Sequence, residues 1–190
     1  MDTWIWILIA VVAVLVVVVI AVTVARNRRA RLRDRFGAEY NRTVDTADNR
    51  REAERELRDR AARRDELELT PLTPGARERF EERWQTVQAA FVDRPVVAVA
   101  DADDLLTQVM RERGYPVDDF ESQSALVSVD HPEVAENYRR GHEIYTKTVD
   151  GSATTEDLRQ AVISYRSLFE ELMRETDVDR EDAGHQRSSG

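Results

Sequence analysis

The stretch WIWILIAVVAVLVVVVIAVTVARNRRARLRDRFG, residues 4–37, joins a long apolar run to a dense group of arginines. Residues 4–25 carry no charge and one hydroxyl, that of Thr23. A helix rises about 1.5 Å per residue, so this run is about 33 Å long when helical. The hydrocarbon core of a bilayer is about 30 Å thick. The sequence therefore predicts a transmembrane helix over residues 4–25.

A cleavable signal peptide is the main competing interpretation of this run. Such a peptide has a basic start and an apolar stretch of about 7–15 residues. Here Met1-Asp2-Thr3 contains no Lys or Arg, and only Thr23-Val24-Ala25 resembles a cleavage site. A buried core helix is a third interpretation. The length and the missing positive charge favour the uncleaved membrane span.

The arginines after the run predict its orientation. Lys and Arg beside a membrane span stay on the cytoplasmic side. We therefore expect residues 1–3 outside the cytoplasm and the C-terminal domain inside it. Residues 26–37 form a membrane collar, expected to bind anionic lipid headgroups at about 1 kcal/mol per basic residue near the surface. The alternative is that the collar only stops translocation. Its arginines are Arg26, Arg28, Arg29, Arg31, Arg33 and Arg35.

Charge and composition narrow the classes of partner and of chemistry. The net charge is −9, but residues 26–35 sum to +5 and residues 36–190 sum to −13. An acidic body repels nucleic-acid phosphates, so no nucleic-acid partner is expected. The chain has no cysteine, which excludes disulfides, thiolate nucleophiles and cysteine-based metal sites.

Residues 38–75 are predicted to form a charged helical spacer that ends in a Pro/Gly linker. Pairs such as Glu54 and Arg58 place an acid four residues before a base, which supports a helix. A thin apolar seam consists of Ala53, Leu57 and Ala61. The simplest interpretation of the spacer is a solvated helix. It is otherwise open to three interpretations: a free stalk, a weak self-association strand, or a helix lying on the following bundle.

Residues 76–173 show apolar stripes with the period of a helix. Helix starts are expected at Thr73-Pro74, at Asp93 to Pro95, at Asp130-His131-Pro132-Glu133 and at Thr154 to Asp157, with a shorter helix around 118–127. The D-x-x-E at 130–133 resembles a capping box. The predicted fold is all-α, with one transmembrane helix, the charged spacer and an antiparallel bundle of four to five short helices. Residues 174–190 are expected to be a disordered tail.

Few residues of the bundle carry the marks of a chemical site. Asp101, Asp103 and Glu112 match three positions of a calcium loop, but leucines fill the places that need a ligand and a glycine. His131 is interpreted as a turn residue and His142 as a packed or partly exposed helix residue. We therefore expect no metal, no cofactor and no catalytic residue.

The loop Arg113-Gly114-Tyr115-Pro116-Val117 presents one aromatic side chain. Tyr115 is predicted as a possible partner contact. The alternative is a helix stop whose tyrosine folds back onto the core.

A series of short motifs resembles an uncharacterised family of small actinobacterial helical proteins, whose members are commonly labelled hypothetical, membrane or secreted. The similarity runs from the collar to Leu172. The resemblance implies a real domain and a regular membrane span, and it implies no activity. The motifs are Arg83–Gln88, Phe91-Val92-Asp93-x-Pro95, Arg113–Val117, Ser128–Pro132 and Tyr165–Leu172.

These observations predict a single-pass membrane-anchored protein rather than an enzyme. Its bundle is expected to act as a protein-interaction or scaffolding module at the cytoplasmic membrane, binding another protein or itself. An exported domain, with the N-terminal segment cleaved or reversed, is one alternative. An enzyme with an unrecognised site is the other.

Overall fold

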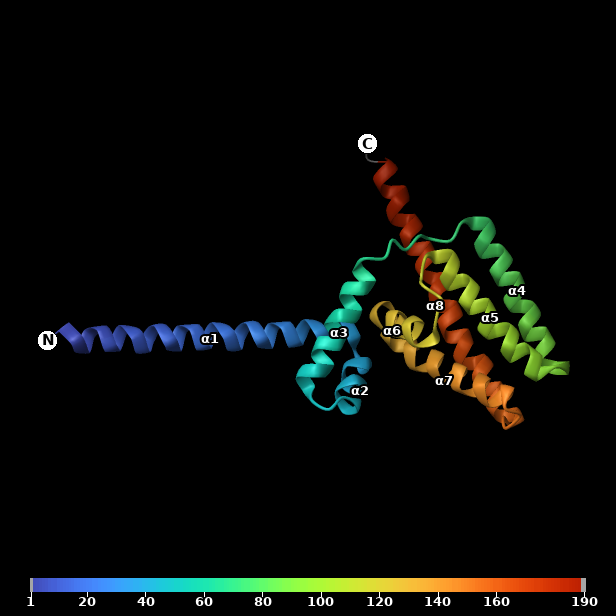
Figure 1. Cartoon of the computed structure of the whole chain (residues 1–190). Helices are drawn as coiled ribbons and strands as arrows, with labels where there is room; N and C mark the ends of the chain where they lie inside the picture. Colours follow the sequence, from blue (N-terminus) through green and yellow to red (C-terminus); the bar gives the residue numbers. More distant parts are fainter. Residues whose placement is uncertain (1, 189–190) are drawn as a thin grey trace. The chain divides into compact units, whose positions relative to one another are not determined.

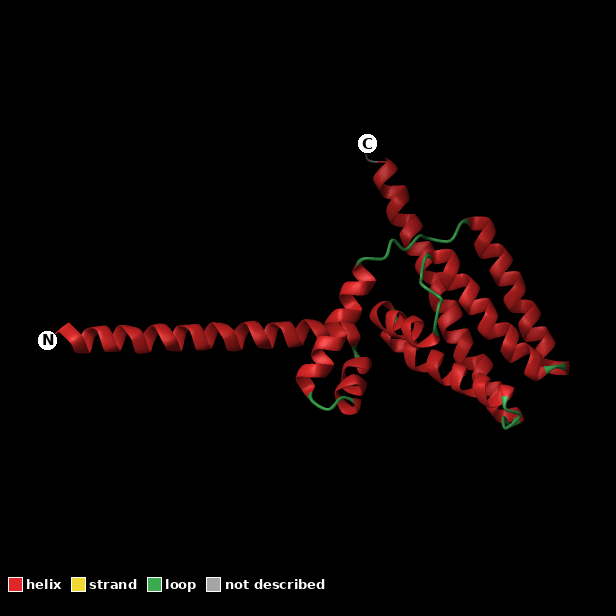
Figure 2. Ribbon diagram, in the orientation of Figure 1, coloured by secondary structure: helices red, strands yellow, loops and turns green. Residues whose placement is uncertain are grey.

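The computed structural model describes residues 2–188, without the side chains of residues 2, 3, 5, 6, 9–11, 13 and 175–188. The described residues form eight helices and no strand (Figures 1 and 2), which confirms the all-α class. The chain divides into two compact units, residues 1–58 and residues 59–190. The boundary falls inside a helix, α3, and not at the Pro/Gly linker.

The N-terminal unit contains α1 (Asp2–Phe36), α2 (Ala38–Thr46) and the first half of α3 (Arg50–Asp65). Helix α1 is continuous through the apolar run and the arginine collar. It ends at Gly37, whose φ of 49° lies in the left-handed region that glycine adopts without strain. The turn at Gly37 starts α2 directly after the collar.

The predicted membrane span, residues 4–25, lies within α1. Among the described residues, no helix has the length and apolar character needed to cross a membrane. Six positions of the predicted span, residues 5, 6, 9–11 and 13, have side chains outside the described part. Its described side chains are largely exposed, as at Val17 (65%) and Ile20 (55%). The described part of this run is therefore not a core helix.

The apolar seam of the spacer is buried, and not a solvated face. Ala53 and Leu57 are fully buried, and they belong to the N-terminal unit together with buried Leu32, Phe36 and Tyr40 of α1 and α2. The apolar periodicity of the sequence identifies the seam, but it does not show which residues pack against it. The first half of α3 is thus part of a small folded unit and not a free stalk.

The C-terminal unit is a helical bundle, as expected. It contains α4 (Pro74–Asp93), α5 (Pro95–Arg113), α6 (Phe120–Asp130), α7 (Pro132–Val149) and α8 (Thr155–Ser188). Helix α5 packs against α4, α7 and α8 (Figure 1), and its buried face includes Leu105, Leu106 and Val109. The rings of Trp84 on α4 and Phe169 on α8 stack with centroids 4.8 Å apart.

The Pro/Gly linker is packed onto this bundle. The Leu72 side chain is buried in the bundle core, and Leu67 and Leu69 pack against that core. The Thr70 amide donates a hydrogen bond to the Arg113 carbonyl (2.9 Å). The linker residues therefore belong to the folded C-terminal unit.

Several helix boundaries follow from capping chemistry that the sequence shows. The Thr73 hydroxyl accepts from the Ala76 amide (3.2 Å), with Pro74 in the first turn of α4. Thr154 and Asp157 bond reciprocally at the start of α8, the arrangement of a capping box. Gly114 ends α5 with a φ of 97°.

The expected cap of α7 at Asp130 is wrong. His131, and not Asp130, is the N-cap of α7, and it caps without a side-chain hydrogen bond. The Asp130 carboxylate instead accepts from the Tyr115 hydroxyl (2.7 Å) and pairs with Arg64. These partners lie far away in the sequence, so local spacing could not show that they compete for this carboxylate.

The structure describes helix over residues 174–188 of the segment predicted as a disordered tail. Helix α8 continues to Ser188, and residues 189–190 lie outside the described residues. The segment 174–188 contains no proline and many good helix formers. A lack of apolar periodicity does not by itself exclude a helix.

Gly141 of α7 is predicted to be essential for close packing of α7 against α8. A Cβ at this position would lie 2.7 Å from Cε1 of the buried Tyr165 ring. We expect Gly141→Ala to destabilise the bundle by about 1–3 kcal/mol, because the core has no room for a methyl group. The measurement is chemical unfolding of the full chain in detergent, followed by near-ultraviolet circular dichroism.

Gly75→Ala is the matched control, because its Cβ would meet nothing nearer than Arg79 Nη1 at 3.8 Å. We expect it to be neutral or slightly stabilising. Equal loss of stability in the two variants would contradict the packing argument.

Candidate functional site

The arginine collar lies on the last turns of α1, and all six arginines are exposed. Arg29 Nε lies 3.0 Å from Glu54 Oε1 of α3. The Arg33 guanidinium lies 5.3 Å from the centroid of the Tyr40 ring on α2, within the range of a cation–π contact. The collar is thus tied to the two helices that follow it.

Glu54 joins the three helices of the N-terminal unit. Besides the pair with Arg29, its Oε1 accepts a hydrogen bond from the Tyr40 hydroxyl (3.0 Å). The pKa of Tyr40 is raised, mainly by burial and secondly by the neighbouring Glu54 carboxylate. The hydroxyl therefore stays protonated and keeps donating its hydrogen bond to Glu54. The expected pairing of Glu54 with Arg58 is not formed, because Arg58 Nε bonds to the backbone carbonyl of Glu54 (2.8 Å).

A hollow of about 460 Å³ lies between α1 and α3, and we call it the α1/α3 hollow. One wall is apolar and comes from α1: Ala21, Val24, Ala25 and Leu32. The other lining residues are charged: Arg28, Arg29, Arg51, Glu54 and Arg58. Four guanidinium groups and one carboxylate therefore line a space beside apolar side chains.

A second hollow of about 370 Å³ involves further arginines of the same two helices. Arg26, Arg29 and Arg33 come from α1 and Arg50 from α3. The arginines of α3 were missed as site residues in the sequence. The glycine at position 37 could have indicated them. A turn there reverses the chain after the collar, so that α3 lies beside α1.

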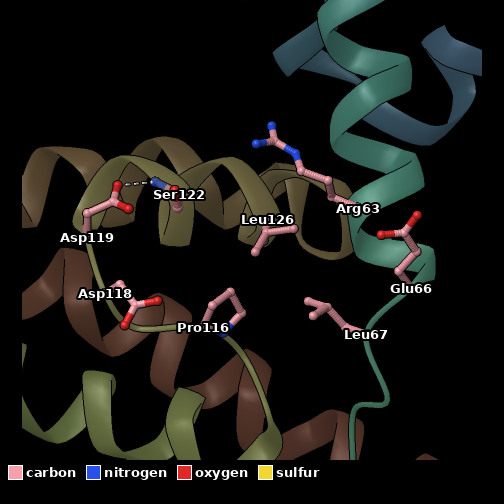
Figure 3. Close-up of a pocket in the computed structure, with 8 residues that line it drawn as sticks. All are labelled: Arg63, Glu66, Leu67, Pro116, Asp118, Asp119, Ser122 and Leu126. Carbon is pink, nitrogen blue, oxygen red and sulfur yellow. Dashed lines mark hydrogen bonds between the residues drawn. The ribbon is translucent and has the colours of Figure 1, made fainter.

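The bundle has a separate pocket of about 380 Å³ (Figure 3). The side chains of Leu67, Pro116 and Leu126 lie around its centre and form its apolar lining (Figure 3). The charged lining residues are Arg63, Glu66, Asp118 and Asp119. This combination can hold a basic side chain with an apolar stem.

Asp119 has a structural role at the rim of this pocket. Its Oδ1 accepts from the Ser122 amide (2.8 Å) at the start of α6. The hydrogen bonds from the Ser122 backbone and side chain lower the pKa of Asp119. Asp119 therefore stays ionised as a helix cap.

A polar cluster centred on Asp103 joins three helices of the bundle. Asp103 Oδ1 accepts from the Tyr165 hydroxyl (2.5 Å) and lies 3.1 Å from His142 Nδ1. The His142 ring stacks on Phe120 with centroids 3.6 Å apart. Burial, followed by the charge of Asp103, raises the pKa of Tyr165 and of Tyr138 far above the usual range. Neutral phenols of this kind hold helices together and are poor bases or nucleophiles.

The remaining sequence-predicted residues are dispersed. Tyr115 is 3% exposed and its hydroxyl bonds to Asp130, so it folds back onto the core and is not presented to a partner. His131 is buried, with Nδ1 3.4 Å from Glu171 Oε1. Asp101 is exposed, whereas Asp103 belongs to the cluster above. In the described part of the chain, no three His, Cys, Asp or Glu side chains come together to hold a metal ion.

The buried tyrosines predict how the stability of the bundle depends on pH. The folded-state pKa values of Tyr138 and Tyr165 lie above the ordinary 10.0. Their contribution to stability is therefore complete below pH 10 and is lost as the pH rises above it. Each group adds a loss of up to about 1.4 kcal/mol per pH unit.

Urea unfolding of the full chain in detergent, at pH values on both sides of 10, measures this loss. We expect Tyr165→Phe to show a shallower decrease than the wild type, because one titrating group is removed. An identical pH dependence in the two proteins would contradict the assignment.

Comparison of the chain with protein families, curated proteins and solved structures finds no match. The resemblance to small actinobacterial helical proteins therefore stays a prediction.

Proposed function

We propose that the chain is a single-pass membrane protein whose acidic bundle is a protein-interaction or scaffolding module on the cytoplasmic side. The observation that carries this proposal is the separation of charge between the two units. Residues 26–58 contain eleven arginines and seven acidic residues, a net charge of +4. Residues 59–190 have a net charge of −12. An anionic membrane surface attracts a basic unit and repels an acidic bundle, which favours placing the bundle in the aqueous phase.

The chemistry of residues 4–25 supports insertion in a bilayer. The run has no charge, and its one hydroxyl, on Thr23, bonds back to the carbonyls of Val19 and Ile20 (2.9 Å each). Lipid offers no hydrogen bonds, so a polar group that is satisfied within its own helix suits this environment. The exposed valines of α1 would be covered by acyl chains.

The pocket in the bundle supports the interaction role. Three carboxylates and one arginine line it, so its net charge is negative, and the rest of its lining includes apolar side chains. This lining favours a basic segment of a partner protein. The perturbed pKa values belong to tyrosines in the core and to surface groups such as Asp119 and Glu156. Since these groups do not meet in one pocket, an interaction module explains the structure better than an enzyme does.

The topology can be tested with single cysteines, because the chain has none of its own. We expect Thr3→Cys to react with a membrane-impermeant maleimide on intact cells. Ser152→Cys, at an exposed turn before α8, is expected to react only after the cells are permeabilised. Labelling of Ser152→Cys from outside, or loss of the N-terminus from the intact mass, would support the exported alternative instead.

The partner pocket can be tested by proximity labelling from the C-terminus of the full chain. We expect Asp118→Arg to remove the partner signal, because it reverses a charge at the pocket rim. Asp101→Arg is the matched control: it makes the same charge change at an exposed position outside the pocket. A signal no richer than that of residues 1–37 alone would contradict the interaction role.

A further inference from the structure

We propose that the α1/α3 hollow binds one anionic phospholipid, with the phosphate on its arginines and an acyl chain along its apolar wall. The inference rests on the proposed function, because membrane insertion of α1 would bring lipid to this hollow. It differs from general attraction by the collar, since it names a site built from two helices. It therefore predicts that some arginines matter far more than others.

The basic wall has positive charge that the protein does not neutralise locally. The acid in its lining, Glu54, is already bonded to Arg29 and to the Tyr40 hydroxyl. Arg28 and Arg51 have no ion-pair partner among the described residues. Arg58 is held by its Nε on the Glu54 carbonyl, which fixes its guanidinium beside the hollow. Guanidinium groups from two helices thus converge where a phosphate can accept several charge-assisted hydrogen bonds.

The apolar wall gives the site its preference for a lipid. Ala21, Val24 and Ala25 have the spacing of one helix face and lie within two turns of Arg28. The two alanines have small side chains, which leave space beside α1. A soluble phosphate uses only the basic wall, whereas a phospholipid uses both walls.

The size of the hollow agrees with part of a lipid. Its volume of about 460 Å³ falls in the range of about 300–1,000 Å³ usual for ligand sites. A two-chain phospholipid is larger than this space. The hollow therefore accommodates the headgroup and the first part of one chain, and the rest of the lipid stays in the bilayer.

The test is native mass spectrometry of the full chain in detergent, titrated with phosphatidylglycerol or with phosphatidylcholine. We expect the first phosphatidylglycerol to bind at least about tenfold more tightly than phosphatidylcholine. The double variant Arg28→Gln/Arg51→Gln is expected to lose that preference.

Arg42→Gln/Arg55→Gln is the matched control, because it removes two exposed arginines from the same N-terminal unit, and neither lines the hollow or belongs to the collar. We expect it to retain the preference within about threefold. Equal losses in the two double variants would overturn the proposal, since they would show general attraction by net charge.

Ala25→Trp tests the apolar wall while leaving every arginine in place. We expect it to weaken phosphatidylglycerol binding, because the indole fills the space for the chain. Inorganic phosphate and glycerophosphoglycerol, which lacks acyl chains, are expected to compete poorly with the lipid. Effective competition by either compound would overturn the lipid assignment and identify a site for soluble anions.

Failure of this inference can be distinguished from failure of the proposed function. Carbonate extraction of membranes and maleimide labelling of Ser152→Cys report insertion and topology without requiring the hollow. If the chain resists extraction with the expected topology but shows no lipid preference, only the lipid site is wrong. If carbonate releases the chain, the proposed membrane anchor itself is wrong.

Discussion

Among the described residues, three carboxylates each bind a tyrosine hydroxyl and a nitrogen-bearing side chain, and each thereby joins three separate segments of the fold. Glu54 holds Tyr40 and Arg29, Asp103 holds Tyr165 and His142, and Asp130 holds Tyr115 and Arg64. A partly buried carboxylate is costly unless its oxygens are satisfied. Each acid therefore orders the elements that carry its partners. Glu54 acts in the N-terminal unit, and the other two act in the C-terminal unit.

These pairings also decide which charges remain for other uses. Once Arg29 and Tyr40 satisfy Glu54, Arg28 and Arg51 remain beside the apolar end of α1, and that excess of positive charge is the basis of the proposed lipid site. In the bundle, Tyr115 is occupied by Asp130, so the exposed acids of the α5–α6 connection, and not the aromatic ring, are available to a partner. The proposed membrane and partner roles rest on the charged side chains that are not neutralised within the protein.

Much of the fold could be predicted because helix signals are local. Thr73 with Pro74, Gly114, and Thr154 with Asp157 set helix boundaries through contacts within a few residues, and the structure shows each of them. Prediction failed where a distant partner competes for a residue. Asp130 has the spacing of a cap, but Tyr115 and Arg64 take its carboxylate. The continuation of α8 was missed for another reason, since apolar periodicity reports burial and not helicity.

The sequence by itself determined the all-helical class, most helix boundaries, the apolar run and the position of the collar, because each depends on residue order and short-range chemistry. Only the tertiary structure decided the burial of Ala53 and Leu57, the inward position of Tyr115 and the three shared carboxylates. It also decided that Arg51 and Arg58 of α3 line a hollow with Arg28 of α1. These features depend on how the chain reverses after Gly37 and on which side chains of other elements satisfy each partly buried carboxylate.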